Sequence, residues 1–371
     1  MSTSKMLGSR ASTGIAIAAA LLAACAPKDD QASSEGAVMT DSATAAAAAP
    51  REMPTPNDQQ KAVLDELASL GGKPIETLTP AEARKQPTPA DAVKKLLEKQ
   101  GKSTAPEPVA KVVDRKIAGP GGQIPIRIYT PAGAGPFPVI VYYHGGGFVI
   151  ADLDTYDASP RALANAANAV VVSSHYRQAP EHKFPASHED AFAAYQWTVK
   201  NAASIKGDPK RVAVAGESAG GNLAANVAIM ARDKQVQMPV HMLLVYPVAG
   251  SDMNTASYQE NANAKPLNKA MMSWFVEHTL KSPAEAQDPR INLLGADLKG
   301  LPSTTIIAAE IDPLRTEGET LAQKLKDAGV DTEHSTYEGA AHEFFGMAAV
   351  VDKAKDAQGK AADGLKKAFN K

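Results

Sequence analysis

The sequence predicts an α/β fold built on a mostly parallel sheet of eight strands. Short apolar runs bounded by turn residues recur between residues 109 and 337, and such runs are typical of buried strands. Helical patterns separate most of these runs, which favours a parallel sheet with helices on both faces. One run, Val212 to Ala215, passes through a glycine-rich turn directly into a helical pattern. These three observations together predict the fold class.

The length, charge and cysteine content of the chain limit its domain size, its partners and its disulfide bonds. Its 371 residues are enough for one large domain with additions and a substantial core. The formal net charge is −2, so nothing indicates nucleic acid or an acidic surface as a partner. Cys25 is the single cysteine, which excludes an intrachain disulfide framework.

Residues 1–24 have the pattern of an export signal. Basic residues precede an apolar segment at residues 15–24 that is too short to span a bilayer comfortably. The segment Leu22-Ala23-Ala24-Cys25 resembles the lipobox of bacterial lipoproteins, which implies cleavage before Cys25 and acylation of that cysteine. Several acyl chains on one residue would anchor the protein stably to a membrane. The alternative is an ordinary cleaved signal that contains a cysteine.

The next two segments differ in composition. Residues 25–56 are rich in alanine, serine, proline and acidic residues without periodicity, as expected of a flexible tether. Within residues 57–105, Thr79-Pro80-Ala81-Glu82 and Thr88-Pro89-Ala90-Asp91 are each typical of a capped helix start. We expect residues 57–105 to form short cap helices that pack on a larger domain.

The larger domain is expected to span residues 106–371. Its strands are predicted at residues 109–118, 123–129, 139–143, 169–173, 212–215, 241–246, 304–309 and 332–337, with helices at 158–168 and 191–200. The alternation breaks at about 250–289, where a polar stretch leads into a helix with several large apolar side chains. We expect this segment to be a cap insertion above the carboxyl edge of the sheet.

The pattern Gly216-x-Ser218-x-Gly220 joins the predicted strand at 212–215 to the following helix. In that setting G-x-S-x-G holds a serine nucleophile on a strained turn, with its hydroxyl pushed clear of the sheet. The flanking glycines allow strand and helix to approach closely. The same pattern occurs by chance in about one chain in ten of this length, so the assignment needs partner residues.

A serine nucleophile needs a histidine base, which follows the serine in chain order when the serine lies on such an elbow. His342 is the candidate because it lies in a loop directly after the last predicted strand. The other downstream histidines are less well placed, because they begin a strand, lie in the insertion or lie within a strand. They are His241, His278 and His334, respectively.

The base in turn needs an acid that orients it. Asp312 is the candidate, since it directly follows the predicted strand at residues 304–309. Glu310 is the alternate, because an error of one residue in the register of that strand would exchange the two. A charge at the surface end of the strand is the simpler role for Glu310.

The segment His144-Gly145-Gly146-Gly147 follows the predicted strand at residues 139–143. Three consecutive glycines leave backbone N–H groups unobstructed, which suits donors to an oxyanion, with the N–H of Ala219 as a further donor. The alternatives are a plain glycine turn and a phosphate-binding loop. The lysine and the serine or threonine of a P-loop do not follow, which disfavours phosphate.

Five segments resemble the hormone-sensitive-lipase group of α/β-hydrolases, the bacterial family IV esterases. In the family's order and spacing they are His144–Phe148, His175–Ala186, Gly216–Gly221, Asp312–Arg315 and His342–Phe344. The resemblance extends from about residue 57 to the C-terminus. It implies Ser218 as nucleophile, His342 as base, Asp312 as the acid, and a cap built from the N-terminal helices and the insertion.

Two glutamates depart from the pattern of that family. Members usually carry aspartate or threonine at the position of Glu217, and commonly glycine at the position of Glu343. An extra carboxylate beside His342 would shift the basicity of the imidazole and the pH optimum. For the charged residues Arg177, Glu181 and Asp190 we expect a structural salt-bridge network rather than substrate binding.

The sequence therefore predicts a serine carboxylesterase that hydrolyses short- to medium-chain acyl or aryl esters through an acyl-enzyme, without metal or cofactor. Its oxyanion donors are expected to be the N–H groups of Gly146, Gly147 and Ala219, with that of Gly145 as a further candidate. One rival is a deacetylase of an envelope polysaccharide or another acetylated substrate. The other is a non-catalytic ligand-binding protein, which the presence of all three candidate catalytic residues disfavours.

The expected partners and location follow from the same features. The partner is a small-molecule ester, with no nucleic acid, and the membrane is reached through Cys25. A homodimer is left open. Ala26 stands where inner-membrane lipoproteins of enterobacteria carry aspartate, so the expected location is the outer membrane, on its periplasmic or surface side.

Overall fold

The computed structural model describes residues 53–371. The predicted signal at residues 1–24, the lipidation site Cys25 and all but the last residues of the predicted tether lie outside the described residues. None of the helices within residues 53–371 is long and apolar enough to cross a membrane.

Eight strands form a single sheet in the order β1-β2-β4-β3-β5-β6-β7-β8. They are β1 (Lys111–Gly119), β2 (Gly122–Thr130), β3 (Phe137–Tyr143), β4 (Val170–Ser174), β5 (Gly207–Glu217), β6 (Met242–Val245), β7 (Thr304–Ile311) and β8 (Thr332–Ala341). The pairs β1–β2 and β2–β4 are antiparallel, and all other neighbours are parallel. The predicted fold class, a mostly parallel eight-stranded sheet, is therefore confirmed.

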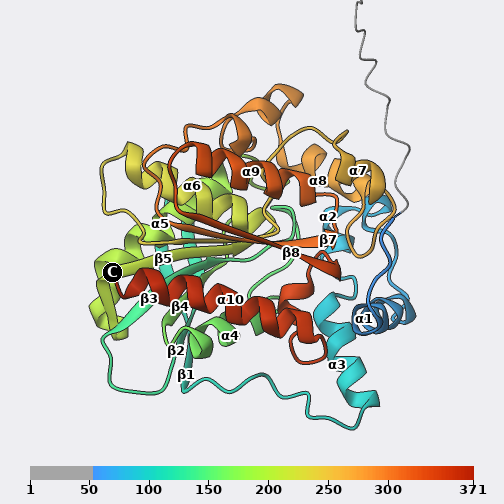
Figure 1. Ribbon diagram of the computed structural model, residues 1–371, viewed down its shortest axis with the longest axis horizontal. Coiled ribbons are helices and arrows are strands. Elements are labelled where there is room, and N and C mark those ends of the chain that lie inside the picture. The colour runs from blue at the N-terminus through green and yellow to red at the C-terminus, as the bar shows by residue number, and fades with distance from the viewer. Residues whose placement is uncertain (1–52) are drawn as a thin grey trace, which may run out of the picture. The chain divides into compact units, whose positions relative to one another are not determined.

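Helices cover both faces of the sheet because its central strands are apolar on both sides. In β5, Val212 and Val214 pack into one core with α5, α6 and α9, whereas Ala213 and Ala215 pack into the other with α4 and α10. Figure 1 shows these two helical layers on opposite sides of the strands. The helices are α4 (Ala158–Ala166), α5 (Ala186–Asn201), α6 (Ala219–Asp233), α9 (Arg315–Asp327) and α10 (Asp352–Phe369).

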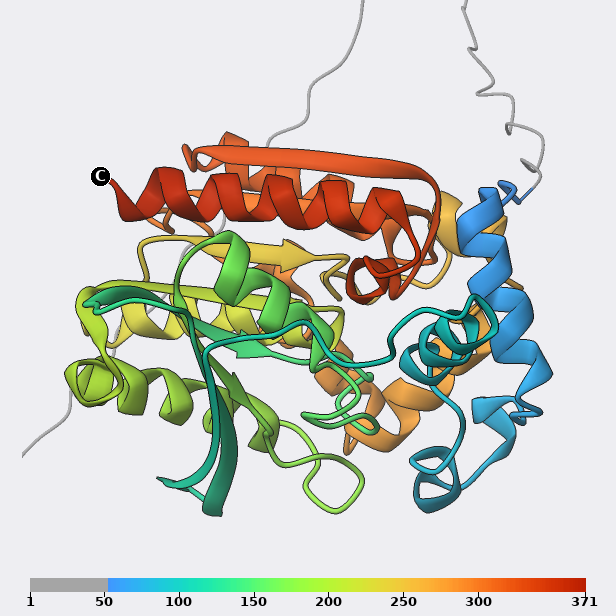
Figure 2. The same ribbon diagram turned by 90° about the horizontal axis from the view of Figure 1, so that it is seen from below.

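Additional helices gather at the carboxyl end of the parallel strands (Figure 2). The N-terminal group comprises α1 (Asp58–Ser69), η1 (Ile75–Thr77), α2 (Pro80–Ala83) and α3 (Pro89–Lys99), and the insertion contains α7 (Ala256–Glu260), α8 (Lys269–Thr279) and η3 (Pro283–Gln287). The short 3₁₀ segments η2 (Ala202–Ile205), η4 (Leu293–Gly295) and η5 (Phe344–Met347) complete the fold. The predicted capping boxes are confirmed, since Thr79 with Glu82 and Thr88 with Asp91 exchange the expected hydrogen bonds.

The N-terminal helices and the insertion contact each other above the sheet. The indole N–H of Trp274, in α8, donates to the carbonyl oxygen of Leu78 at 3.0 Å. Trp274 and Phe275 belong to the same apolar cluster as Ile75 and Leu78. The large apolar residues of α8 thus serve partly as cap packing, one of the roles such residues fill at helical spacing.

Several elements extend beyond their predicted bounds. Strand β5 begins at Gly207 rather than at residue 212, because Gly207 pairs with Phe137 of β3. Helix α5 begins at Ala186 rather than at residue 191, directly after Pro185. Strand β8 continues to Ala341, so that His342 is the first residue after the strand. Apolar runs locate the centre of an element better than its polar ends.

Candidate active site

Ser218 occupies the sharp turn between β5 and α6 with φ 56° and ψ −118°. A non-glycine residue with positive φ is strained, and such strain is common at functional sites. The turn is held by the backbone N–H of Ser218, which donates to the carbonyl oxygen of Val245 at 2.9 Å, and by the carbonyl of Ser218, which accepts from the N–H of Val248 at 3.1 Å. The predicted strand–turn–helix setting of Ser218 is therefore present.

The glycines on either side of Ser218 are required by close backbone approach. A Cβ atom on Gly220 would lie 1.9 Å from the carbonyl oxygen of Tyr143, and one on Gly216 would lie 2.1 Å from the carbonyl oxygen of Gly220. Backbone atoms cannot move aside as a flexible side chain can. The glycines of the motif thus permit helix α6 to start against strand β3.

Asp312 and His342 form a buried pair at the ends of β7 and β8. The Nδ1 atom of His342 lies 2.7 Å from Oδ2 of Asp312. The other carboxylate oxygen, Oδ1, accepts from the N–H of Leu314 at 2.8 Å, which fixes the orientation of the carboxyl group. The residues are 0% and 3% exposed, so their interaction is shielded from water. The pair has the geometry expected of an acid that orients a histidine.

Strand order brings Ser218 and His342 to the same edge of the sheet. Ser218 follows β5, and Tyr246 follows β6, which is the neighbour of β5. The ring of Tyr246 packs against the imidazole of His342 with 4.5 Å between ring centroids. No hydrogen bond joins the Ser218 hydroxyl to His342 among residues 53–371, and such bonds often tighten only when substrate binds.

Charges near His342 favour the imidazolium. Burial disfavours that charged form and lowers the pKa of His342, but the carboxylates of Asp312, Glu343 and Glu217 outweigh it and raise the net pKa above its ordinary value. A raised pKa makes the neutral imidazole a stronger proton acceptor and lowers the fraction of it that is present at a given pH.

The glycine loop after β3 presents unused N–H groups. Gly146 and Gly147 have φ 94° and 56°, a backbone conformation that favours glycine. Their carbonyls are occupied, since Gly146 accepts from the N–H groups of Val149 and Ile150 and Gly147 accepts from the Thr279 hydroxyl at 3.2 Å. Within residues 53–371 no hydrogen bond uses the N–H of Gly145, Gly146, Gly147 or Ala219. These groups therefore remain available as oxyanion donors.

His144 anchors the glycine loop. Its ring stacks on Tyr176 at 4.5 Å between centroids, and the Tyr176 hydroxyl donates to the His144 carbonyl at 2.9 Å. Burial, together with the nearby His175, lowers the pKa of His144 to about 3. The imidazole is neutral at physiological pH and is not placed as a proton carrier.

The alternate acid, Glu310, has no hydrogen bond or ion pair with His342 within residues 53–371. Its carboxylate accepts from the N–H of Gly339 at 2.7 Å, while Asp312 makes the contact with His342. The other downstream histidines lie elsewhere in the fold. His241 bonds Ser303 and Thr305, His278 packs on Trp274, and His334 lies in β8.

Sequence reasoning missed two side chains that hold the loop of Asp312. The amide of Asn261, in the insertion, donates to the carbonyls of Glu310 at 3.4 Å and Asp312 at 3.3 Å. The hydroxyl of Ser257 donates to the carbonyl of Pro313 at 2.6 Å. Both residues belong to a polar stretch without periodicity, so no local signal distinguishes them.

The charged residues of the segment after β4 form ion pairs. Arg177 lies 2.8 Å from Asp190, and Arg84 of the N-terminal group pairs with Glu181 at 2.7 Å. Arg84 also donates to the carbonyl of Val149, just after the glycine loop. These contacts fit the structural network expected from the sequence.

Glu217 and Glu343 accept hydrogen bonds from tyrosine hydroxyls, and both lie near enough to His342 to raise its pKa. The hydroxyls of Tyr142 and Tyr246 donate to Glu217, and the hydroxyl of Tyr156 donates to Glu343 at 2.5 Å. Loss of hydration on burial and then the charge of Glu343 raise the pKa of Glu217 to about 7.

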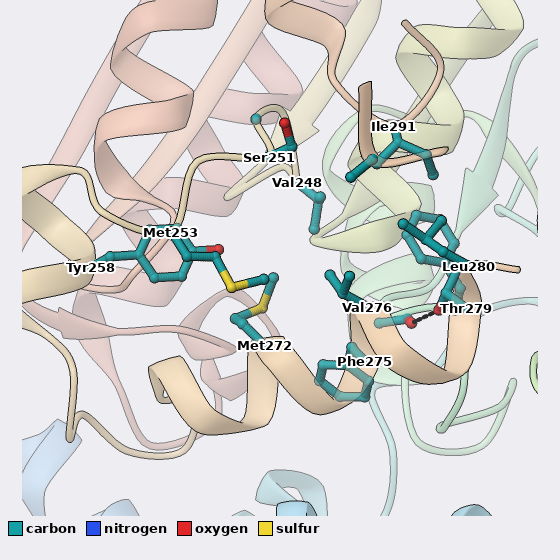
Figure 3. Close-up of a pocket in the computed structure, with 14 residues that line it drawn as sticks. Val248, Ser251, Met253, Tyr258, Met272, Phe275, Val276, Thr279, Leu280 and Ile291 are labelled. Carbon is teal, nitrogen blue, oxygen red and sulfur yellow. Dashed lines mark hydrogen bonds between the residues drawn. The ribbon is translucent and has the colours of Figure 1, made fainter. Parts of the chain in front are cut away.

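An apolar pocket lies beside the glycine loop, with about 560 Å³ of space that protein atoms do not fill and that is partly open to solvent. Figure 3 shows Val248 and Val276 facing each other across it, with Met253 and Met272 at one end and Leu280 and Ile291 at the other. Gly147 and Phe148 complete the wall nearest the loop. The pocket thus adjoins Gly147, one of the candidate oxyanion donors.

No group of three or more His, Cys, Asp or Glu side chains in the described part of the chain could hold a metal ion.

Comparison with known proteins identifies the family. Residues 140–346 match the family described as the α/β hydrolase fold. The chain is 41% identical over 281 residues to the carboxylesterase NlhH of Mycobacterium tuberculosis, covering 72% of this chain and 86% of the relative. The chain belongs to the hormone-sensitive-lipase-like group of α/β-hydrolases.

Other members of the α/β-hydrolase family agree with this assignment. An arylesterase of Saccharolobus solfataricus is 32% identical, over 68% of this chain and 83% of its own length. The structure of a hyperthermophilic esterase from the archaeon Pyrobaculum calidifontis superposes with a TM-score of 0.77 at 36% identity, covering 85% of this chain and 99% of that one. This α/β-hydrolase is a carboxylic ester hydrolase, and its substrates are small-molecule esters.

Proposed function

We propose that this α/β-hydrolase cleaves esters by a serine mechanism, with Ser218 as nucleophile, His342 as general base and Asp312 as the acid that orients it. The observation that supports this proposal most directly is the buried pair of Asp312 and His342, whose side chains lie 2.7 Å apart. The pair lies at the sheet edge where Ser218 occupies a turn with positive φ. Unused N–H groups of the glycine loop lie at the same edge. These are the parts that acyl transfer requires.

The steps follow from these roles. The Ser218 hydroxyl oxygen attacks the ester carbonyl carbon while Nε2 of His342 takes the hydroxyl proton. The oxyanion accepts hydrogen bonds from the N–H groups of Gly146, Gly147 and Ala219, with Gly145 alongside. Collapse of the tetrahedral intermediate breaks the bond to the alcohol oxygen, which leaves with the proton from Nε2. Water, deprotonated by the same nitrogen, then releases the acid and restores Ser218.

The apolar pocket supports short- to medium-chain acyl or aryl esters as substrates. Its lining is dominated by aliphatic side chains, methionines and aromatic rings, and it includes Gly147 of the glycine loop. An acyl chain whose carbonyl oxygen contacts the glycine loop would therefore extend into an apolar wall. Ethyl acetate hydrolase of Pseudomonas putida, 32% identical to this chain, is a relative named for a short ester.

Hydrolysis of p-nitrophenyl esters from acetyl to palmitoyl, by wild type and Ser218→Ala, tests this proposal. We expect the variant to lose about 10⁴-fold or more in kcat/KM, because the oxyanion donors and substrate binding alone retain only residual activity. The wild type should prefer acyl chains up to medium length. Near-normal hydrolysis by Ser218→Ala would remove Ser218 from its role, and a higher rate on acetylated sugars than on matched simple esters would favour a deacetylase.

We also propose that the mature protein is anchored to the outer membrane through acylated Cys25. The proposal rests on the lipobox-like sequence and on Ala26, which follows the cysteine. Radiolabelled palmitate should label the wild type, which should fractionate with outer membranes, whereas Cys25→Ala should be unlabelled and soluble after export. A wild type without label would instead indicate an ordinary cleaved signal.

A further inference from the structure

The residue directly after the candidate base has an unexpected backbone. Glu343 adopts φ 71°, in the left-handed region that favours glycine. For any other residue type this conformation is strained, because the Cβ atom crowds the backbone. The turn after β8 would therefore be more stable with glycine, and a strained residue retained beside a base invites a functional explanation.

The carboxylate of Glu343 is held in one place by Tyr156. The Tyr156 hydroxyl donates to Oε1 of Glu343 at 2.5 Å, and the same Oε1 lies 3.9 Å from Nε2 of His342. Nε2 is the nitrogen that exchanges protons with Ser218, whereas Nδ1 is occupied by Asp312. The two nitrogens of His342 thus face separate carboxylates.

Tyr156 also contacts the glycine loop. A Cβ atom built on Gly145 would lie 2.2 Å from the Tyr156 hydroxyl oxygen, so the phenol packs directly against the backbone of Gly145. One phenol therefore links the loop of candidate oxyanion donors to the carboxylate beside the base. Tyr156 is 6% exposed, and the side chain of Glu343 is 20% exposed, so water screens this contact only in part.

We propose that the Tyr156–Glu343 pair is a positioning device for His342, which holds the imidazolium through Nε2 and thereby sets the pH range of the enzyme. The proposal rests on the proposed serine mechanism, in which His342 is the base. Glu343 acts through His342 and does not touch the reacting carbonyl in this arrangement, so it is a positioning residue.

Other titratable groups on the surrounding elements lie near His342 or near the glutamates Glu217 and Glu343. Asp312 follows β7, Glu217 ends β5, Tyr142 lies in β3, Tyr246 follows β6, and Tyr156 precedes α4. Burial raises the pKa of Glu343, while the charge of His342 and the hydrogen bond from Tyr156 lower it in part. The net pKa of Glu343 is therefore above its ordinary value, and the imidazolium of His342 opposes the effect of burial by favouring the carboxylate.

The direction of the effect is set by the sign of the charge. An anion near Nε2 favours the imidazolium, so the free base becomes available only at higher pH. Removal of Glu343 should lower the pKa of His342 and extend activity to lower pH. A merely structural role predicts loss of stability instead, and glycine at position 343 should relieve the strained φ.

The test compares kcat/KM from pH 5 to 9 and thermal stability for wild type, Glu343→Gln, Glu343→Gly and Tyr156→Phe. Lys206→Gly is the matched control, because exposed Lys206 also has a positive φ of 62° but lies far along the chain, before β5. On the acidic side of the profile of kcat/KM against pH, activity should begin about one pH unit lower in both Glu343 variants. The shift should be smaller in Tyr156→Phe. Glu343→Gly and Lys206→Gly should both keep or raise the Tm, and Lys206→Gly should keep the wild-type pH profile.

If the acidic side of the kcat/KM profile is the same in Glu343→Gln and Glu343→Gly as in wild type, the proposal is wrong, whatever the stability of the variants. Ser218→Ala is measured alongside to separate this failure from failure of the serine mechanism. If Ser218→Ala is inactive and the acidic side of the profile does not move, only the role of Glu343 is wrong. If Ser218→Ala retains activity, the serine mechanism itself is wrong.

Discussion

The side-chain amide of Asn57 donates to the carbonyl oxygen of Gly339 at 3.1 Å, three residues before His342. The backbone N–H of Asn57 donates to the same carbonyl oxygen at 3.0 Å, and the N–H of Gly339 donates to the carboxylate of Glu310. Gly339 has φ 62°, and a Cβ atom there would lie 2.9 Å from the backbone nitrogen of Asn57. The start of α1 and the end of β7 thus hold the end of β8, the strand that leads to His342.

Replacing Asn57 should loosen the end of β8. Asn57 is also the N-cap of α1, since its Oδ1 accepts from the N–H of Gln60 at 3.0 Å. Asn57→Ala should lower the free energy of unfolding by about 1 kcal/mol through the lost cap, with a further loss from the bond to Gly339. Asn57→Asp retains a cap acceptor but cannot donate to Gly339. Equal stability and equal kcat in wild type and Asn57→Asp would show that the side-chain bond to Gly339 contributes nothing.

Sequence patterns located the catalytic candidates but not the residues that support them. Glu310 and Asp312 are two positions apart at the end of the same apolar run, and the pairing of β7 with β8 is irregular there, between Ala309 and Ile311. Local sequence does not show which of the two carboxylates contacts His342. Asn57 and Asn261 act on loops that are distant in sequence. Their roles depend on tertiary contacts, and such contacts produce no periodic pattern in the local sequence from which they could be predicted.

The fold could be predicted where it follows from local sequence patterns and not where it depends on tertiary contacts. Buried strands such as β3 and β4 carry continuous apolar runs, so their positions follow from composition. The glycines of the elbow follow from a motif whose geometry is general. The strained Glu343 was visible only as a departure from the family pattern, and its contact with Tyr156 required the coordinates.

Glycine at position 147 should be essential for the candidate oxyanion loop. A Cβ atom there would lie 2.3 Å from the ring of Phe275 in the cap, and the φ of 56° disfavours any side chain. Gly147→Ala should therefore displace the loop and lower kcat by about 10²-fold, the effect of losing one oxyanion donor.

The control for Gly147→Ala is Gly71→Ala. Gly71 has a similar φ of 74°, but a Cβ atom there meets nothing within 4 Å. It should lose about 1 kcal/mol of stability from the backbone conformation alone and retain wild-type kcat. If both variants lose kcat equally, the effect at position 147 is general destabilisation rather than displacement of a donor.

Glu217→Gln should change how stability depends on pH. The pKa of Glu217 is raised by burial and by Glu343 from 4.5 to about 7, so the folded state binds an extra proton between these values. Wild-type stability therefore falls as pH rises from about 4.5 to 7, and the full penalty persists above 7. The shift corresponds to about 3 kcal/mol, as an order of magnitude.

Glutamine resembles the protonated carboxyl group and has no such penalty. Thermal unfolding of wild type and Glu217→Gln between pH 5 and 9 should show the variant gaining relative stability as pH rises. Glu317, whose pKa burial also raises to about 7, is present in both proteins and cancels in the difference. A stability difference that is constant across this range would show that Glu217 remains ionised in the folded protein throughout.

Val276→Phe should shorten the acyl chains that the enzyme accepts. Val276 lies on α8 and faces Val248 across the apolar pocket, so a larger ring would fill space that a longer chain needs (Figure 3). One methylene in an apolar pocket changes specificity by about 10–200-fold. The ratio of kcat/KM for hexanoyl over acetyl p-nitrophenyl esters should fall by at least 10-fold, on that basis, with acetyl hydrolysis retained.

Val236→Phe, at an exposed position outside the pocket lining, should leave the ratio unchanged. If Val276→Phe also leaves it unchanged, the acyl chain binds elsewhere and this pocket does not set chain length.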